Sequence, residues 1–194
     1  MIGIDEVGRG AWAGPLLVVA ARDTGQLPDG LMDSKMLTKL RRQSLHALIE
    51  VVCDIGEGWV SAEEIDTLGL TEAMRLAVRR ALLDVEARAD EEIIMDGHIN
   101  YCDDTFVNVQ AVIDADATYP IVSAASIYAK VIRDAVMTDF AKQFPEYGLE
   151  RHVGYGTAQH RAALLTHGIT PIHRKSYKPV RAYVSNQNES SGRP

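Results

Sequence analysis

The chain has 194 residues, of which 46% are hydrophobic and 24% are charged, and its formal net charge is -7. This length and balance predict one globular domain with a substantial core and exclude an intrinsically disordered protein. The sequence has no run of about 18 apolar residues and no secretory signal at its N-terminus, so we expect a cytoplasmic protein that does not enter a membrane. Two cysteines, Cys53 and Cys102, do not form the pattern of a disulfide framework and are expected to be reduced.

The predicted elements begin with a hairpin. Residues 1–7 and 15–22 are apolar runs separated by glycines, which is typical of two strands joined by a turn. Leucines and isoleucines at helical spacing predict a helix over 38–52, and a third strand is expected over 54–60.

A capping-box spacing of Ser61 and Glu64 then predicts the start of a short helix. The remaining predicted elements are an amphipathic helix over 71–87, strands over 92–96 and 106–112, and helices over 121–140 and 158–165. This order predicts an α/β domain whose sheet mixes antiparallel and parallel strands. We expect a single domain over 1–184 that includes a basic helical lobe from about 141, followed by a disordered tail over 185–194.

Charge is segregated along the chain. From residue 141 onward eight lysines and arginines face three glutamates, a charge of +5 that leaves -12 for residues 1–140. Because phosphate contacts come from lysine and arginine, an acidic body with a basic C-terminal segment is compatible with a metal-holding core and a phosphate-facing lobe. Solvated surface charge explains such a bias equally well.

Acidic side chains stand at the ends of predicted strands. Asp5 and Glu6 follow the apolar run of the first strand, Asp96 ends the strand over 92–96, and Asp116 precedes the long helix. Ionised carboxylates in a buried strand are costly to desolvate unless a cation compensates them, so a divalent metal is the natural partner. Adjacent residues of a strand point to opposite faces, so geometry alone makes only one of Asp5 and Glu6 a ligand.

The amino-terminal signature of the ribonuclease HII family, a type 2 ribonuclease H, resembles the string Gly3-Ile4-Asp5-Glu6-Val7-Gly8-Arg9-Gly10. Blocks similar to the family's later motifs follow in the family's order: Asp33-Ser34-Lys35, Tyr119 to Asp134, Gly154-Tyr155-Gly156-Thr157 with His160, and His173 to Val180. The resemblance covers about residues 1 to 181. It implies a ribonuclease H-like fold, with a mixed five-stranded sheet flanked by helices and a helical C-terminal segment.

The resemblance also implies a catalytic and metal-binding set of four carboxylates: Asp5, Glu6, Asp96 and Asp116. Oxygen-only ligands favour Mg²⁺ or Mn²⁺, and two such ions about 4 Å apart with substrate bound could activate water and stabilise the leaving oxygen. Asp114 places one more negative charge beside Asp116, where it either raises the proton affinity of that carboxylate or faces solvent.

The same resemblance assigns substrate-binding roles. In the family the Gly8-Arg9-Gly10 element recognises the ribose and Tyr155 packs against the next sugar, whereas Lys35 meets backbone phosphate. Arg174 and Lys175 are weaker candidates for phosphate contact. Without the flanking acids, a glycine-rich hairpin with an exposed arginine is the preferred interpretation of residues 8–10, and Tyr155 taken alone is an ordinary loop aromatic.

We therefore expect a monomeric endoribonuclease that cleaves the RNA strand of RNA/DNA hybrids, and 5′ of ribonucleotides embedded in duplex DNA, leaving 3′-hydroxyl and 5′-phosphate ends. The Asp-Glu-Val-Gly-Arg-Gly form favours type HII over type HIII. One alternative is a catalytically silent hybrid-binding module. Another is a metal-free carboxylate-pair hydrolase such as a glycosidase, whose activity would survive chelation.

Overall fold

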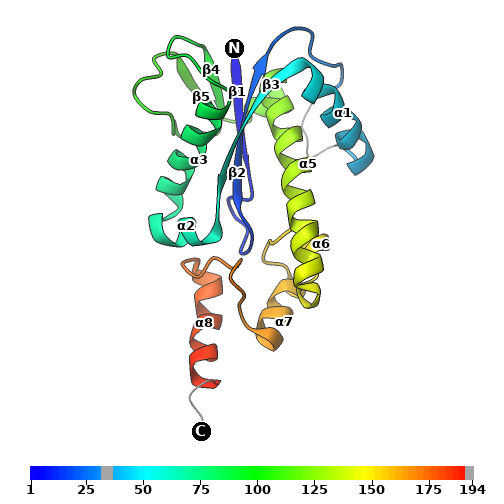
Figure 1. Ribbon diagram of the computed structural model, residues 1–194, viewed down its shortest axis with the longest axis vertical. Helices are drawn as coiled ribbons and strands as arrows, with labels where there is room; N and C mark the ends of the chain where they lie inside the picture. The colour runs from blue at the N-terminus through cyan, green and yellow to red at the C-terminus, as the bar shows by residue number, and fades with distance from the viewer. Residues whose placement is uncertain (32–36, 191–194) are drawn as a thin grey trace. The chain divides into compact units, whose positions relative to one another are not determined.

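The computed structural model describes residues 1–31 and 37–190, with side chains described to residue 184 (Figure 1). The chain divides into two compact units. The first unit consists of Met1–Val7, Leu17–Trp59 and Met74–Ile132, and the second of Gly8–Leu16, Val60–Ala73 and Arg133–Pro194. The domain boundary at residue 184 stays a prediction.

The first unit is built on a five-stranded sheet in the order β3-β2-β1-β4-β5. Its strands are β1 (Ile2–Val7), β2 (Leu16–Asp23), β3 (Cys53–Val60), β4 (Ile93–Asp96) and β5 (Val109–Val112). β1 pairs antiparallel with β2 and parallel with β4, and β4 pairs parallel with β5, which confirms the predicted hairpin and mixed sheet. The strand expected over 106–112 is shorter because the Phe106 N–H donates to the Asp103 carbonyl and closes a turn.

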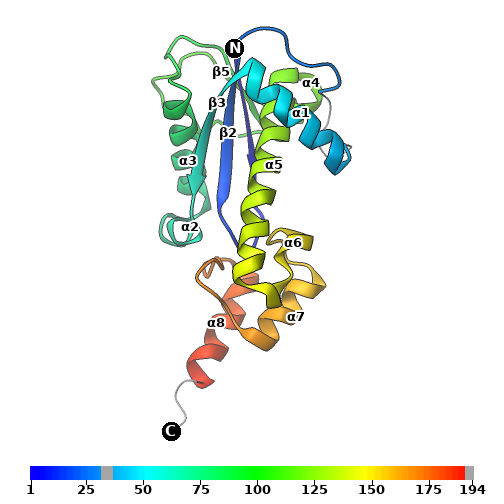
Figure 2. The same ribbon diagram turned by 45° about the vertical axis from the view of Figure 1, so that its right-hand side comes forward.

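Helices cover both faces of this sheet: α3 (Leu70–Asp84) lies on one face, and α1 (Lys39–Val52) and α5 (Pro120–Gln143) lie on the other (Figure 2). α3 packs directly on β3. The two backbones lie so close at Gly58 that an added Cβ would collide with the Ala77 carbonyl oxygen. On the other face Gly3 of β1 lets α5 approach, since a Cβ there would come within 2.6 Å of the Ile121 carbonyl carbon.

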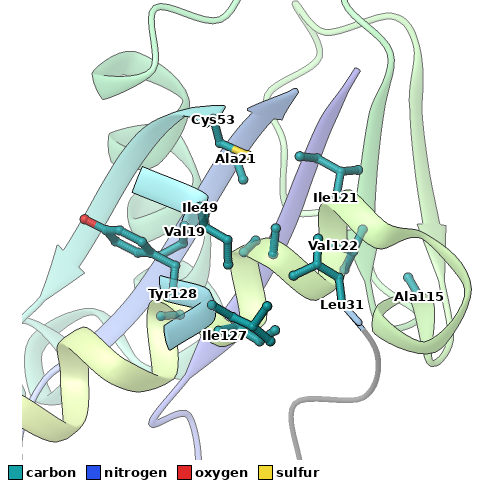
Figure 3. Packing of buried hydrophobic residues seen from close by; sticks show 14 of the residues in the cluster. Val19, Ala21, Leu31, Ile49, Cys53, Ala115, Ile121, Val122, Ile127 and Tyr128 are labelled. Atoms are coloured by element: carbon teal, nitrogen blue, oxygen red, sulfur yellow. The ribbon is translucent and has the colours of Figure 1, made fainter. Parts of the chain in front are cut away.

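The main core fills the space between the sheet and the α1–α5 layer (Figure 3). Val19 and Ala21 of β2 meet Ile49 of α1 and Val122 and Ile127 of α5, and all five side chains are fully buried. The short helix α4 (Ala115–Thr118) joins this core through Ala115. Strand pairing between β1 and β4 and between β4 and β5 holds the ends of these three strands in register.

The second unit is mainly helical. Its elements beyond residue 60 are α2 (Ala62–Leu68), the end of α5, a 3-10 turn at Pro145–Tyr147, α6 (Leu149–His152), α7 (Ala158–His167) and α8 (Lys178–Ser190). Ser61 and Glu64 form the predicted capping box of α2, and Thr157 accepts from the His160 N–H at the start of α7. Met137, Tyr147 and Leu164 centre its core.

α8 is described to Ser190, so this helix extends beyond residue 185, where we expected the tail to begin. The disorder of the tail stays a prediction. Among the described residues, no helix has the length and apolar character needed to cross a membrane.

Candidate active site

Two of the predicted acids share one edge of the sheet in the first unit. β1 and β4 run parallel with Ile4 opposite Met95, so Asp5 and Asp96, the next residues of each strand, emerge at the same carboxyl-terminal edge. Asp96 in turn lies opposite Val112, the last residue of β5. The side chain of Asp5 is 7% exposed, and that of Asp96 is half-buried.

Asp96 also fixes the segment that carries Asp116. The Ala115 N–H donates to Asp96 Oδ1 at 2.8 Å, which ties the first turn of α4 to the end of β4. Asp116 follows in that turn and is 5% exposed. Asp114 adopts a left-handed conformation (φ 53°) at the start of α4, and its side chain is exposed to solvent.

Asp5 lies in an environment that disfavours its ionised form. Burial raises its pKa to about 8, and the neighbouring charges of Glu6 and Asp96 push the pKa in the same direction. Hydrogen bonds from the Ser126 side chain and from the Glu6 N–H, at 2.7 Å to Asp5 Oδ1, partly offset that rise. A buried carboxyl group with like charges beside it is stabilised in its ionised form by a cation.

The described residues do not contain three His, Cys, Asp or Glu side chains close enough to form a ready metal cage. The structure therefore couples Asp5, Glu6 and Asp96 electrostatically and ties Asp96 to the turn of Asp116, but it does not close the four carboxylates around one point. The donor set still fits Mg²⁺ or Mn²⁺, because it offers only carboxylate groups, two of which belong to the buried side chains of Asp5 and Asp116.

The glycine-arginine-glycine element begins the second unit, directly after β1 in the chain. The Ala11 N–H donates to the Gly8 carbonyl, and Gly8 has a φ of 85°, so residues 8–11 form a tight turn. The Trp12 N–H donates to the Gly154 carbonyl at 2.8 Å, which brings this turn beside the loop of Tyr155.

Tyr155 borders that turn. A Cβ built on Gly10 would lie 3.9 Å from the Tyr155 ring, and the ring is 38% exposed. The Arg133 guanidinium lies 5.9 Å from the ring centre. Gly10 and Tyr155 are thus neighbours, and their substrate-binding role stays a prediction.

A pair of buried histidines supports the Tyr155 loop from within. The Thr170 N–H donates to His173 Nδ1, so His173 donates through Nε2 to His160 Nε2 at 3.0 Å, and His160 Nδ1 donates to the Tyr155 carbonyl. Burial lowers the pKa of both histidines to about 4, which keeps them neutral at neutral pH.

Two expectations for phosphate contacts have different outcomes. Arg174 was expected to face phosphate, and this is wrong: its side chain is fully buried and its N–H groups donate to carbonyls of residues 9 and 14. Lys175 is exposed, so its role stays a prediction. Lys35 lies outside the described residues.

Sequence reasoning missed Ser126 and Arg133 as parts of the site. Ser126 lies one turn after Ser123 on the helix that follows Asp116, and this position was a usable signal. Arg133 gave no signal, because an arginine whose N–H groups donate to backbone carbonyls has no partner visible in the sequence.

The fold and the acid-bearing strand ends define a ribonuclease H-like protein. Residues 2–180 match the family model for ribonuclease HII. Ribonuclease HII of Cereibacter sphaeroides is 45% identical over 187 residues, which cover 93% of this chain and 84% of that protein.

Solved structures agree. The structure of the PCNA and RNase HII complex from Archaeoglobus fulgidus contains a chain that is 27% identical, with a TM-score of 0.77 over 91% of this chain and 94% of that one. Ribonuclease H2 of Pyrococcus horikoshii is 25% identical, with a TM-score of 0.76 over 97% and 98% of the two chains. The chain therefore belongs to the ribonuclease HII family and is a ribonuclease H-type endonuclease.

Proposed function

We propose that this protein is a metal-dependent endoribonuclease that cleaves the RNA strand of RNA/DNA hybrids and cuts 5′ of a ribonucleotide embedded in duplex DNA. The observation that carries the proposal is the edge of the sheet where the buried Asp5 meets the charges of Glu6 and Asp96, with Asp116 tied to Asp96 through α4. Membership of the ribonuclease HII family supports it.

Four carboxylates would hold the ions: Asp5, Glu6, Asp96 and Asp116. Bound Mg²⁺ or Mn²⁺ ions would supply an activated water and charge stabilisation at the phosphodiester. The residues around them orient these ligands: Ser126 hydrogen-bonds Asp5, and Asp96 keeps one oxygen on the Ala115 N–H while the other stays available.

Ribose recognition is assigned to the second unit. A 2′-hydroxyl is the one chemical difference at a ribonucleotide in DNA, and main-chain groups of a tight turn can reach it closely. Gly8, Arg9 and Gly10 form such a turn, and Tyr155 offers an exposed ring against Gly10. Lys35 is proposed to contact backbone phosphate.

The direct test uses duplex DNA with one labelled internal ribonucleotide, with Mg²⁺, with Mn²⁺ and with a chelator. Cleavage 5′ of the ribonucleotide is expected with metal, giving 3′-hydroxyl and 5′-phosphate ends, and the chelator should stop it. An uncut substrate in both metals overturns the proposal in favour of a silent hybrid-binding module. Cleavage that survives chelation would instead indicate a metal-free carboxylate-pair mechanism.

The Asp96→Asn substitution tests the carboxylate set. Asparagine keeps the oxygen that accepts from Ala115 but loses the negative charge, so cleavage should fall by about a thousandfold, while affinity for the duplex changes little. The matched control is Asp104→Asn, an exposed acid in the same unit, which should cut at the wild-type rate. A fully active Asp96→Asn protein would remove this residue from the metal site.

A further inference from the structure

Two side chains of the second unit donate hydrogen bonds to the same carbonyl group, which belongs to Arg9 in the turn over residues 8–11. Arg174 Nη1 donates to the Arg9 carbonyl oxygen at 3.0 Å, and the Tyr177 hydroxyl donates to the same oxygen at 2.6 Å. Arg174 Nη1 also donates to the Tyr177 hydroxyl at 2.9 Å, which links the two donors. Both lone pairs of that carbonyl are therefore occupied from the interior of the unit.

Arg174 donates hydrogen bonds to carbonyl groups at both ends of the segment over residues 9–14. Its Nε and Nη2 donate to the Gly14 carbonyl at 3.0 and 2.9 Å, so one guanidinium plane fixes residues 9 and 14 together. This use of several N–H groups in a fixed plane requires the fork of arginine, which the single ammonium of lysine does not reproduce.

The backbone between Arg174 and Tyr177 is also held by hydrogen bonds. Asp66 of α2 accepts from the N–H groups of Lys175 and Ser176 at 2.8 Å and from the Ser176 hydroxyl at 2.6 Å. Arg174 and Tyr177 flank these residues in the chain, so the carboxylate holds the backbone from which both donors extend.

The planar peptide bond couples the direction of the Arg9 carbonyl to the direction of the Gly10 N–H. In a planar trans peptide the carbonyl and the following N–H point in opposite directions, and the described residues contain no cis peptide. Fixing the Arg9 carbonyl toward Arg174 therefore fixes the Gly10 N–H away from it. Gly10 is exposed and borders the Tyr155 ring.

We infer that Arg174 and Tyr177 are positioning residues for ribonucleotide recognition, which act by aiming the Gly10 N–H at the ribose. The inference rests on the proposed function. It also explains why a fully buried guanidinium is present, because burying a charge is costly and its partners here are all in or beside the turn.

The test measures discrimination between two ligands by the same protein. Dissociation constants are determined in Ca²⁺, to limit cleavage, for an all-DNA duplex and for the same duplex with one ribonucleotide. The ratio of the two constants should fall about threefold in Tyr177→Phe, which loses one hydrogen bond, and about tenfold in Arg174→Lys, which loses the fork. Affinity for the all-DNA duplex should stay within about twofold.

The ratio separates positioning from folding. Partial unfolding removes binding-competent protein for both duplexes alike, so it leaves the ratio unchanged, and Tyr177→Phe keeps the test valid if Arg174→Lys does not fold. The matched control is Tyr147→Phe, which removes a tyrosine hydrogen bond to the Gly168 carbonyl in the same unit and should keep the wild-type ratio.

Each outcome has one reading. If the wild-type protein binds both duplexes equally, the proposed function itself fails. If the wild type prefers the ribonucleotide and both variants keep its full ratio, the proposed function stands and the positioning inference is overturned. An equal loss of the ratio in Tyr147→Phe would also overturn the inference, because the effect would then not depend on the Arg9 carbonyl.

Discussion

At the scale of single residues, burial makes the ionised form of the Asp5 side chain unfavourable unless a cation compensates its charge. Its pKa is raised from 3.8 to about 8, chiefly by burial. Between these two values the folded protein binds a proton that the unfolded chain has lost, so this group stabilises the metal-free protein below pH 4, and the contribution is lost as the pH rises toward 8. A bound cation would restore the stability at high pH.

The Asp5→Asn substitution tests whether ionisation of the buried Asp5 side chain destabilises the metal-free protein. Because asparagine carries no charge at any pH, the metal-free variant should exceed the wild type in free energy of unfolding by about 5 kcal/mol at pH 8 and by about 2 kcal/mol at pH 5. Thermal unfolding in a chelator at the two pH values measures the difference. Adding Mg²⁺ should stabilise the wild type more than the variant. An equal gain at pH 5 and pH 8 would show that packing, and not ionisation, causes it.

At the scale of elements, glycines in the strands determine how closely a helix can pack on the sheet. Gly58 of β3 touches the backbone of α3 at Ala77, so this position leaves no room for a side chain. The strand pattern alone does not show this, since glycine in a strand has several explanations. The contact fixes α3 against β3, and with it one layer of the first unit.

Gly58→Ala should therefore destabilise the protein by about 3 kcal/mol, because the added methyl group forces β3 and α3 apart. The control is Gly25→Ala in the same unit, where an added Cβ meets nothing within 4 Å. Urea unfolding of both variants gives the comparison. If Gly58→Ala were as stable as Gly25→Ala, the packing of α3 on β3 would have to be looser than described.

Elements whose signals are local were predicted well from the sequence. The β1–β2 hairpin and the capping box at Ser61 both depend on neighbours that are close in the sequence. The strand ends also placed Asp5 and Asp96 at one edge, because parallel strands align their carboxyl ends.

The features that were missed depend on distant partners. The burial of Arg174 among carbonyls more than 150 residues away leaves no local pattern. A buried arginine and a phosphate-binding arginine look the same in a basic block of sequence. The family resemblance therefore misassigned Arg174, and only the fold distinguishes it from the exposed Lys175 beside it.

At the scale of the whole molecule, a protein with a net charge of -7 must bind a polyanion. Its positive charge is concentrated after residue 140, and the exposed lysines there are the groups that could meet phosphate. Such contacts depend on salt but carry no information on sugar or sequence. Affinity and discrimination should therefore be separable by mutation.

Lys175→Gln tests that separation. If its exposed ammonium contacts phosphate, the variant should bind the all-DNA and ribonucleotide-containing duplexes more weakly by the same factor, and the slope of log affinity against log salt should fall by about 0.9. The matched control is Lys142→Gln, an equally charged change at an exposed lysine of the same unit that is already paired with Asp139 at 2.7 Å, and its slope should not change. A selective loss for one duplex would assign Lys175 to sugar recognition instead, whereas equal slopes in the two variants and the wild type would show that Lys175 makes no phosphate contact.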